Sequence, residues 1–110
     1  MKYDVLTIPP FDRQLKRLSK KYRSLKTEYA TLVEELEKNP IQGTPISNNC
    51  FKIRLAIASK GRGKSGGARV ITHIYVENEK VFLLAIYDKS EKSDISDSEL
   101  RELLMEIENS

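Results

Sequence analysis

The residues of this sequence best suited to chemistry are two cations in the segment FKIRL. Lys52 and Arg54 alternate there with apolar residues, so in a strand both side chains would point to one face, about 7 Å apart. Arg69 begins a second strand-like run, and a third run ends in a phenol and another cation, Tyr87 and Lys89. If these strand ends lie together in a sheet, the five side chains converge on one surface.

Such a set of side chains suits phosphodiester cleavage without a metal ion. RNA carries its own nucleophile, the 2′-hydroxyl, so the protein must orient that oxygen, neutralise the pentavalent phosphorane and protonate the leaving 5′-oxygen. The rigid fork of arginine fits phosphate oxygens, and a lysine or a phenol can transfer protons. The alternative is a surface that binds phosphates and cuts nothing, and the spacing alone slightly favours that alternative.

Two other kinds of site are not supported. The GKS turn that begins at Gly63 has Ala58 where a P-loop needs its first glycine, and it lies between two predicted strands. His73 and Cys50 are the only residues of their types, so we expect no metal site, no disulfide framework and no cofactor. Cys50 is expected to be a small buried residue, and His73 to be half-buried, with a contact to RNA as its functional alternative.

The net charge of +3 conceals a strong asymmetry along the chain. Residues 1–26 carry eight Lys or Arg and two acids, and residues 50–70 carry six Lys or Arg and no acid. Residues 94–110 carry six acids and one arginine. A polyanionic partner would explain both basic blocks, although for residues 13–26 a solvated helix face explains the charge equally well.

The pattern of apolar residues predicts a single α+β domain over residues 1–110, with the order βααβββα and helices packed on an antiparallel sheet. Pro9-Pro10 ends the first strand, Asn39-Pro40 ends a helical hairpin, and Ser96 with Glu99 forms a capping box. The expected elements are strand 3–8, helices from Phe11 to Tyr22 and from Leu25 to Lys38, loop 42–49, strands 51–57, 68–76 and 81–87, and a helix after Ser96.

Composition argues for a folded protein of the cytoplasm. Apolar residues make up 39% and charged residues 32% of the chain, which is ordinary for a globular domain. No run of about 18 apolar residues would cross a membrane, and the N-terminus shows no signal-peptide pattern. We therefore expect no contact with a membrane.

The segments FKIRL, GRGKSGGARVI and LLAIYDKSEKSDIS, in this order and followed by a helix, resemble the core of RelE/ParE-superfamily toxins, most closely the HigB-like branch. The resemblance covers nearly the whole chain. It implies a microbial RNase-like fold and the toxin of a type II toxin–antitoxin system. It further implies a ribosome-dependent mRNA endonuclease that acts in the 30S decoding site and arrests translation.

The resemblance also implies roles for individual residues. Lys52 and Arg54 match the pair that binds and polarises the scissile phosphate, and Arg69 matches the arginine that stabilises the phosphorane. Tyr87 and Lys89 lie where the remaining catalytic side chains are found. RelE itself has a tyrosine in its C-terminal tail as proposed general base, and some HigB members use two histidines. Residues 90–110 contain no tyrosine and His73 is the only histidine, so Tyr87 and Lys89 remain the candidates for the base.

The expected partners are mRNA, the ribosome and an antitoxin of helix-turn-helix type, through which alone operator DNA would be bound. Three cations of the glycine-rich segment are expected to bind RNA backbone: Lys60, Arg62 and Lys64. The antitoxin is expected on the helical hairpin, at Lys16, Lys20, Lys21, Tyr22, Leu25 and Tyr29, or else directly over Lys52, Arg54 and Arg69.

Two functions from other classes stay open at this stage. A ParE-like toxin would poison DNA gyrase without cutting RNA, although that branch usually lacks the cationic set. A toxin that has lost its activity would remain as an antitoxin-binding module.

Overall fold

A five-stranded sheet organises the chain, with the strand order β1-β5-β4-β3-β2. The computed structural model describes residues 2–60 and 67–108, so the predicted RNA contacts Arg62 and Lys64 lie outside the described residues. The elements are β1 (Asp4–Thr7), α1 (Pro9–Lys21), α2 (Leu25–Lys38), β2 (Thr44–Pro45), β3 (Cys50–Leu55), a 3-10 turn (Ala58–Lys60), β4 (Ala68–Tyr75), a second 3-10 turn (Val76–Asn78), β5 (Lys80–Asp88) and α4 (Asp97–Glu108).

This architecture confirms the expected α+β class, with two details that differ from the expectation. The first strand, β1, runs parallel to β5, whereas all other pairs of strands are antiparallel. The region 42–49, expected to be a loop, contains the two-residue strand β2, which pairs with β3. Gly43 precedes β2 with a φ of +84°, a conformation that favours glycine.

The helix ends follow the signals in the sequence. Pro9 and Pro10 occupy the first positions of α1, where a missing N–H costs nothing. The Ser96 hydroxyl accepts from the Glu99 N–H at 3.1 Å, and the Glu99 carboxylate accepts from the Ser96 N–H at 3.1 Å, which confirms the capping box that begins α4.

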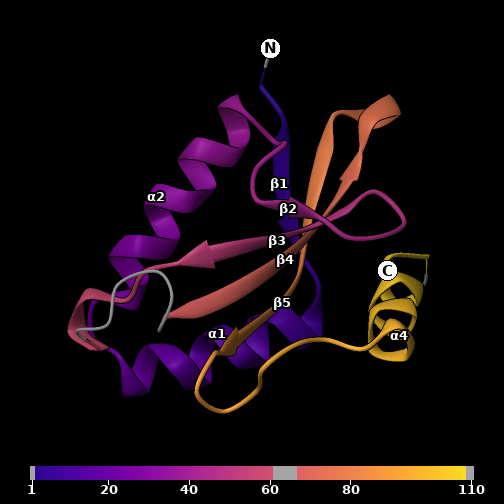
Figure 1. The fold of residues 1–110 in the computed structure, drawn as a ribbon. Helices are drawn as coiled ribbons and strands as arrows, with labels where there is room; N and C mark the ends of the chain where they lie inside the picture. Colours follow the sequence, from indigo (N-terminus) through magenta and orange to yellow (C-terminus); the bar gives the residue numbers. More distant parts are fainter. Residues whose placement is uncertain (1, 61–66, 109–110) are drawn as a thin grey trace.

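Helices cover the sheet from both sides. Ile53, Val70 and Ile86 are neighbours across β3, β4 and β5, and they belong to the same buried core as Leu32 of α2 and Phe11 of α1. α4 lies well apart from α2 (Figure 1), and its residues Leu104 and Ile107 line a cavity with Phe82 of β5. α1 and α4 both border a second cavity beside β5. β5 is therefore covered on both faces, as its continuously apolar sequence predicts. Within the described residues, no helix is long and apolar enough to cross a membrane.

Candidate active site

The register of the sheet brings three of the predicted site residues into one row. Arg54 is the direct cross-strand neighbour of Arg69, and Arg69 is the direct neighbour of Tyr87. Lys52 lies two residues before Arg54 on β3, so its side chain is on the same face. This face is opposite to the one that packs on the helical hairpin, because Ile53, between the two cations, points into the core.

The row becomes less exposed from its edge toward β5. Arg54 is exposed, whereas the side chain of Arg69 is only 5% exposed and its guanidinium Nη1 donates to the Ala68 carbonyl at 3.1 Å. Tyr87 is only 7% exposed. The burial of a cation and a phenol at a strand end places both in surroundings where electrostatic interactions are stronger than in water.

The phenol of Tyr87 is suited to donating a proton. Burial raises the pKa of Tyr87, the charge of Asp94 raises it further, and nearby Arg69 opposes this only in part. The phenol is therefore protonated at neutral pH. Its hydroxyl has no hydrogen-bond partner among the described residues. Of the two roles considered for Tyr87, these properties favour the acid over the base.

Both predicted lysines of the site contact the segment that follows β5. The Lys52 Nζ forms an ion pair with Asp94 at 3.1 Å. The Lys89 Nζ donates to the Ser93 carbonyl at 3.1 Å. Neighbouring residues of one loop, Ser93 and Asp94, thus bind the amino groups of Lys52 on β3 and of Lys89, which directly follows β5.

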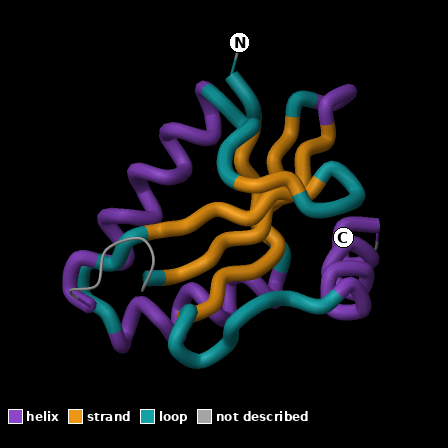
Figure 2. The backbone as a smooth tube through the Cα atoms, in the orientation of Figure 1, coloured by secondary structure: helices purple, strands orange, loops and turns teal. Residues whose placement is uncertain are grey.

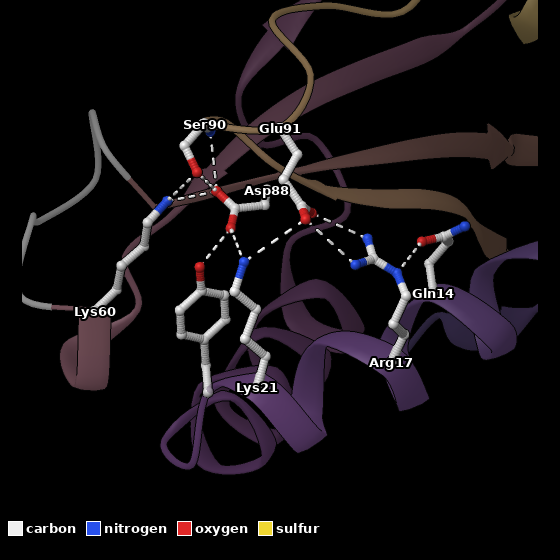
Figure 3. A network of polar contacts seen from close by, with 8 residues as sticks. Gln14, Arg17, Lys21, Lys60, Asp88, Ser90 and Glu91 are labelled. Carbon is white, nitrogen blue, oxygen red and sulfur yellow. Dashed lines mark hydrogen bonds and ion pairs between the residues drawn. The ribbon is translucent and has the colours of Figure 1, made fainter.

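Beside this site lies a buried polar cluster centred on Asp88, the last residue of β5 (Figure 3). Asp88 has no solvent-exposed surface and accepts from the Tyr22 hydroxyl at 2.5 Å, from the Ser90 N–H at 2.9 Å and from the Lys60 ammonium. Burial alone would raise the pKa of the Asp88 carboxyl, but the hydrogen bonds from Lys60, Tyr22 and Ser90 outweigh it and hold the pKa well below its usual range. The carboxylate is charged at any physiological pH.

Two residues expected to bind RNA are placed differently from the cationic row. The Lys60 side chain is 10% exposed and is engaged by Asp88, so this lysine acts within the protein. His73 is half-buried, with its Nδ1 3.5 Å from the Cys50 sulfur, and burial lowers the pKa of its ring. His73 lies four residues along β4 from Arg69, toward α4. Cys50 is buried, as expected, and burial raises the pKa of its thiol to about 11.

The hairpin residues expected to bind the antitoxin divide into two groups. Lys16, Lys20 and Tyr29 line a groove of about 560 Å³ between α1 and α2, whose walls are mostly apolar and basic and include one acid, Asp12. Leu25, by contrast, is fully buried in the core, so its assignment to this surface is wrong. The hydroxyl of Tyr22 points to Asp88.

Lys21, like Tyr22, contacts Asp88 instead of lining the groove. Its ammonium lies 3.8 Å from Asp88 and 3.6 Å from Glu91. Of the hairpin residues predicted to bind the antitoxin, Lys16, Lys20 and Tyr29 are the ones that line a groove open to a partner.

Asp88 and Asp94 were not identified from the sequence, although both contact predicted site residues. The apolar run VFLLAIY ends directly in Asp88, and acids recur every third residue after it, at Glu91 and Asp94. This spacing is the signal that could have identified them. Among the residues that the structure describes, no three His, Cys, Asp or Glu side chains are grouped so as to hold a metal ion.

Comparisons with known proteins agree with this architecture. The E. coli toxin RelE in the free state, as a mutant with two arginines replaced by alanine, superposes with a TM-score of 0.63 at 16% identity, over 96% of this chain and 97% of that one. The isolated E. coli RelE toxin gives 0.57 at 18% identity, over 94% and 97%. RelBE2, a toxin–antitoxin complex from Mycobacterium tuberculosis, gives 0.61 at 21% identity, over 86% of this chain and 95% of the matched chain.

At these identities the structural likeness concerns the fold. The family assignment comes from the sequence, because the model of the family described as the RelE toxin of the RelE/RelB toxin–antitoxin system matches residues 11–107. With the fold and the family model in agreement over almost its whole length, this chain belongs to the RelE toxin family.

Proposed function

We propose that this protein is a ribosome-dependent mRNA endonuclease of the HigB-like branch and the toxin of a type II toxin–antitoxin system. The observation that supports this activity best is the cross-strand row of Arg54, Arg69 and Tyr87, with Lys52 on the same face. A ParE-like gyrase poison would have no need for two arginines and a buried phenol aligned across three strands.

In the proposed reaction the RNA 2′-oxygen attacks the neighbouring phosphorus. Its bond to phosphorus forms, the bond from phosphorus to the 5′-oxygen breaks, and a 2′,3′-cyclic phosphate and a 5′-hydroxyl result. Lys52 and Arg54 bind the phosphate oxygens, and Arg69 stabilises the charge that builds up on the phosphorane. Tyr87, which is protonated, donates to the leaving 5′-oxygen. Lys89, the other candidate for the base, accepts the 2′-hydroxyl proton only as a neutral amine, so the ammonium that donates to the Ser93 carbonyl must first lose a proton.

The ribosome supplies what the site itself lacks. The described part of the site contains no efficient pair of general acid and general base. The pKa of Tyr87 is raised, which makes it a weak acid, and the Lys89 amino group is occupied by a hydrogen bond to the Ser93 carbonyl. Cleavage then depends on holding the RNA with its 2′-oxygen in line with the scissile bond, which can contribute as much to the rate as proton transfer does. We propose that the decoding site of the 30S subunit holds the mRNA in this geometry.

Control of the toxin by an antitoxin forms part of the same proposal. In the RelBE2 structure a protein of this fold is solved together with its antitoxin. We propose that the antitoxin of this chain binds the groove around Lys16 and Lys20 with acidic side chains, and that it blocks entry to the ribosome. The rival arrangement places an antitoxin segment over Lys52, Arg54 and Arg69.

The decisive experiment compares cleavage of one transcript by the purified protein with and without programmed ribosomes. We expect cuts within the coding region on ribosomes and almost none on the same RNA alone. Equal rates with and without ribosomes would refute ribosome dependence. Inhibition of DNA gyrase without any RNA cleavage would instead establish the ParE-like function.

A further inference from the structure

The loop from β5 to α4 carries acids at every third position, and we call residues 88–97 the acidic segment. Figure 2 shows this segment running from the end of β5 to α4. Three of its acids pair with cations from three different parts of the fold: Asp88 with Lys60, Glu91 with Arg17 at 3.1 Å, and Asp94 with Lys52 at 3.1 Å. The protein thus neutralises with its own acids several cations around the end of the sheet that carries the candidate site.

Asp94 is the member of the acidic segment that acts directly on the site. Its Oδ1 accepts from the Lys52 ammonium and also from the Ile95 N–H at 2.8 Å, which fixes the carboxylate in place. The adjacent Ser93 carbonyl accepts from the Lys89 ammonium. Lys89 and Lys52 both lower the pKa of Asp94, after the hydrogen bond from Ile95, so the carboxylate is charged at neutral pH.

A carboxylate and a phosphate compete for the same ammonium group, and they repel each other at short range. RNA that enters the site must therefore displace Asp94 from Lys52 before the lysine can bind a phosphate. The side chains of this pair are 28% and 63% exposed, so the pair is a weak one that solvent screens. RNA that a larger partner holds in place can displace Asp94 from Lys52. Freely diffusing RNA binds the site more weakly, because it must compete with Asp94.

We propose that Asp94 is a specificity-determining residue, which competes with RNA phosphate for Lys52 and so lowers the affinity for RNA that is not held by a larger partner. This inference rests on the proposed function in taking RNA as the substrate. It assigns part of the selectivity for ribosome-bound mRNA to the toxin itself. The remainder comes from the positioning of the RNA by the ribosome.

The test measures binding separately from cleavage. The probe is a short single-stranded RNA with 2′-O-methyl groups, which has no nucleophile, titrated by fluorescence anisotropy at low salt. Asp94→Asn keeps an oxygen for the Ile95 N–H and removes the charge. We expect it to bind the probe about three- to fivefold more tightly than the wild type, the scale of one exposed ion pair, with a smaller difference at high salt.

Two further variants show whether the effect is local. Asp97→Asn changes the net charge equally, from an exposed position in the first turn of α4, and should change the affinity much less. In a Lys52→Ala background the substitution Asp94→Asn should give no gain, because the ammonium for which the two anions compete is gone.

The outcomes separate this inference from the proposed function. Three results would each overturn the inference. They are equal affinities of wild type and Asp94→Asn, an equal gain in affinity from Asp97→Asn, and a gain from Asp94→Asn that persists without Lys52. Loss of ribosomal cleavage by Asp94→Asn at unchanged affinity would also overturn it, and would assign Asp94 to the chemistry. If no variant cuts mRNA on ribosomes, the proposed function fails, while the binding comparison still decides whether Asp94 competes with phosphate.

Discussion

Arg69 combines a positive charge with almost complete burial, at the centre of the cross-strand row. We expect Arg69→Ala to abolish growth arrest, since the loss of one donor to a transition-state oxyanion typically costs about 10²–10³ in rate. The measurement is growth after induction, together with cleavage on programmed ribosomes. Lys52→Ala and Arg54→Ala should have weaker effects if these two residues share one phosphate.

The control for Arg69→Ala is its fold, checked by circular dichroism and thermal unfolding. A residue that served only as part of the surface would change stability by about 0.5 kcal/mol and leave toxicity intact. A folded Arg69→Ala protein that still arrests growth would therefore remove Arg69 from the site.

Tyr87 allows an unusually clean separation of stability from activity. Its hydroxyl is buried without a hydrogen-bond partner among the described residues, so Tyr87→Phe removes a group that contributes little to folding. We expect the free energy of unfolding to be unchanged or slightly higher. Cleavage on ribosomes should fall about 10²–10⁴-fold if the phenol is the proton donor. Unchanged cleavage by a folded Tyr87→Phe protein would rule out that role.

At the scale of elements, Asp88 connects the end of β5 with the helical hairpin and with the turn before β4. Because Asp88 has a lowered pKa when folded, its contribution to stability is present above the ordinary pKa of an aspartate and is lost as the pH falls through and below that value. We expect Asp88→Asn to lower the free energy of unfolding by about 3 kcal/mol at pH 7, because the buried Lys60 loses its partner charge.

The pH dependence distinguishes this role from simple packing. Urea unfolding at a series of pH values should show the wild type losing stability below about pH 5, with a clearly smaller loss in Asp88→Asn. Asp97→Asn, a change at an exposed acid, serves as the control and should follow the wild type. Parallel curves for Asp88→Asn and wild type would contradict the assignment.

The elements that could be predicted from the sequence are those with a local signal. The stripe of apolar residues gave α2 its observed limits, Leu25 and Lys38, and the Ser96–Glu99 pair marked the start of α4. Alternation placed Lys52 and Arg54 on one face. The antiparallel order of β3, β4 and β5 then predicted that Arg69 and Tyr87 lie on the same face as these two cations.

Contacts between distant residues have no such signal. Parallel pairing of β1 with β5 and the pairing of Lys52 with Asp94 both depend on how the whole chain closes, which no local pattern encodes. Lys60 shows the same effect: its neighbours in sequence suggest an RNA-binding cation, but Asp88 lies beside it in space. Leu25 was expected on the antitoxin-binding surface and is instead fully buried in the core.

At the scale of the whole molecule, the basic groove of the hairpin and the cationic row lie on opposite faces of the sheet. If the antitoxin uses the groove, a Lys16→Ala/Lys20→Ala protein should associate with it more slowly and with a weaker dependence on salt. Association rates measured by surface plasmon resonance at several salt concentrations test this. The probe is the purified antitoxin, which we expect to be encoded in the neighbouring reading frame.

Lys21→Ala is the matched control, because the Lys21 side chain is 49% exposed but its ammonium already pairs with Asp88 and Glu91 of the same chain. It removes one charge from the same helix and should affect association less than either groove lysine does. Wild-type kinetics in the Lys16→Ala/Lys20→Ala protein would favour an antitoxin that covers Arg69 directly.

The parallel pairing of β1 with β5 has a consequence for how the toxin is made. Asp4 pairs with Lys80, a separation of 76 residues, so a chain that grows from its N-terminus holds β1 unpaired for most of its synthesis. Such distant contacts slow folding, because the entropy of closing the loop is lost before the contacts form. The row that ends at Tyr87 cannot assemble until β5 has emerged. Under the proposed function, most of the chain is therefore synthesised before the protein can cut RNA, and this interval is available for an antitoxin to be made.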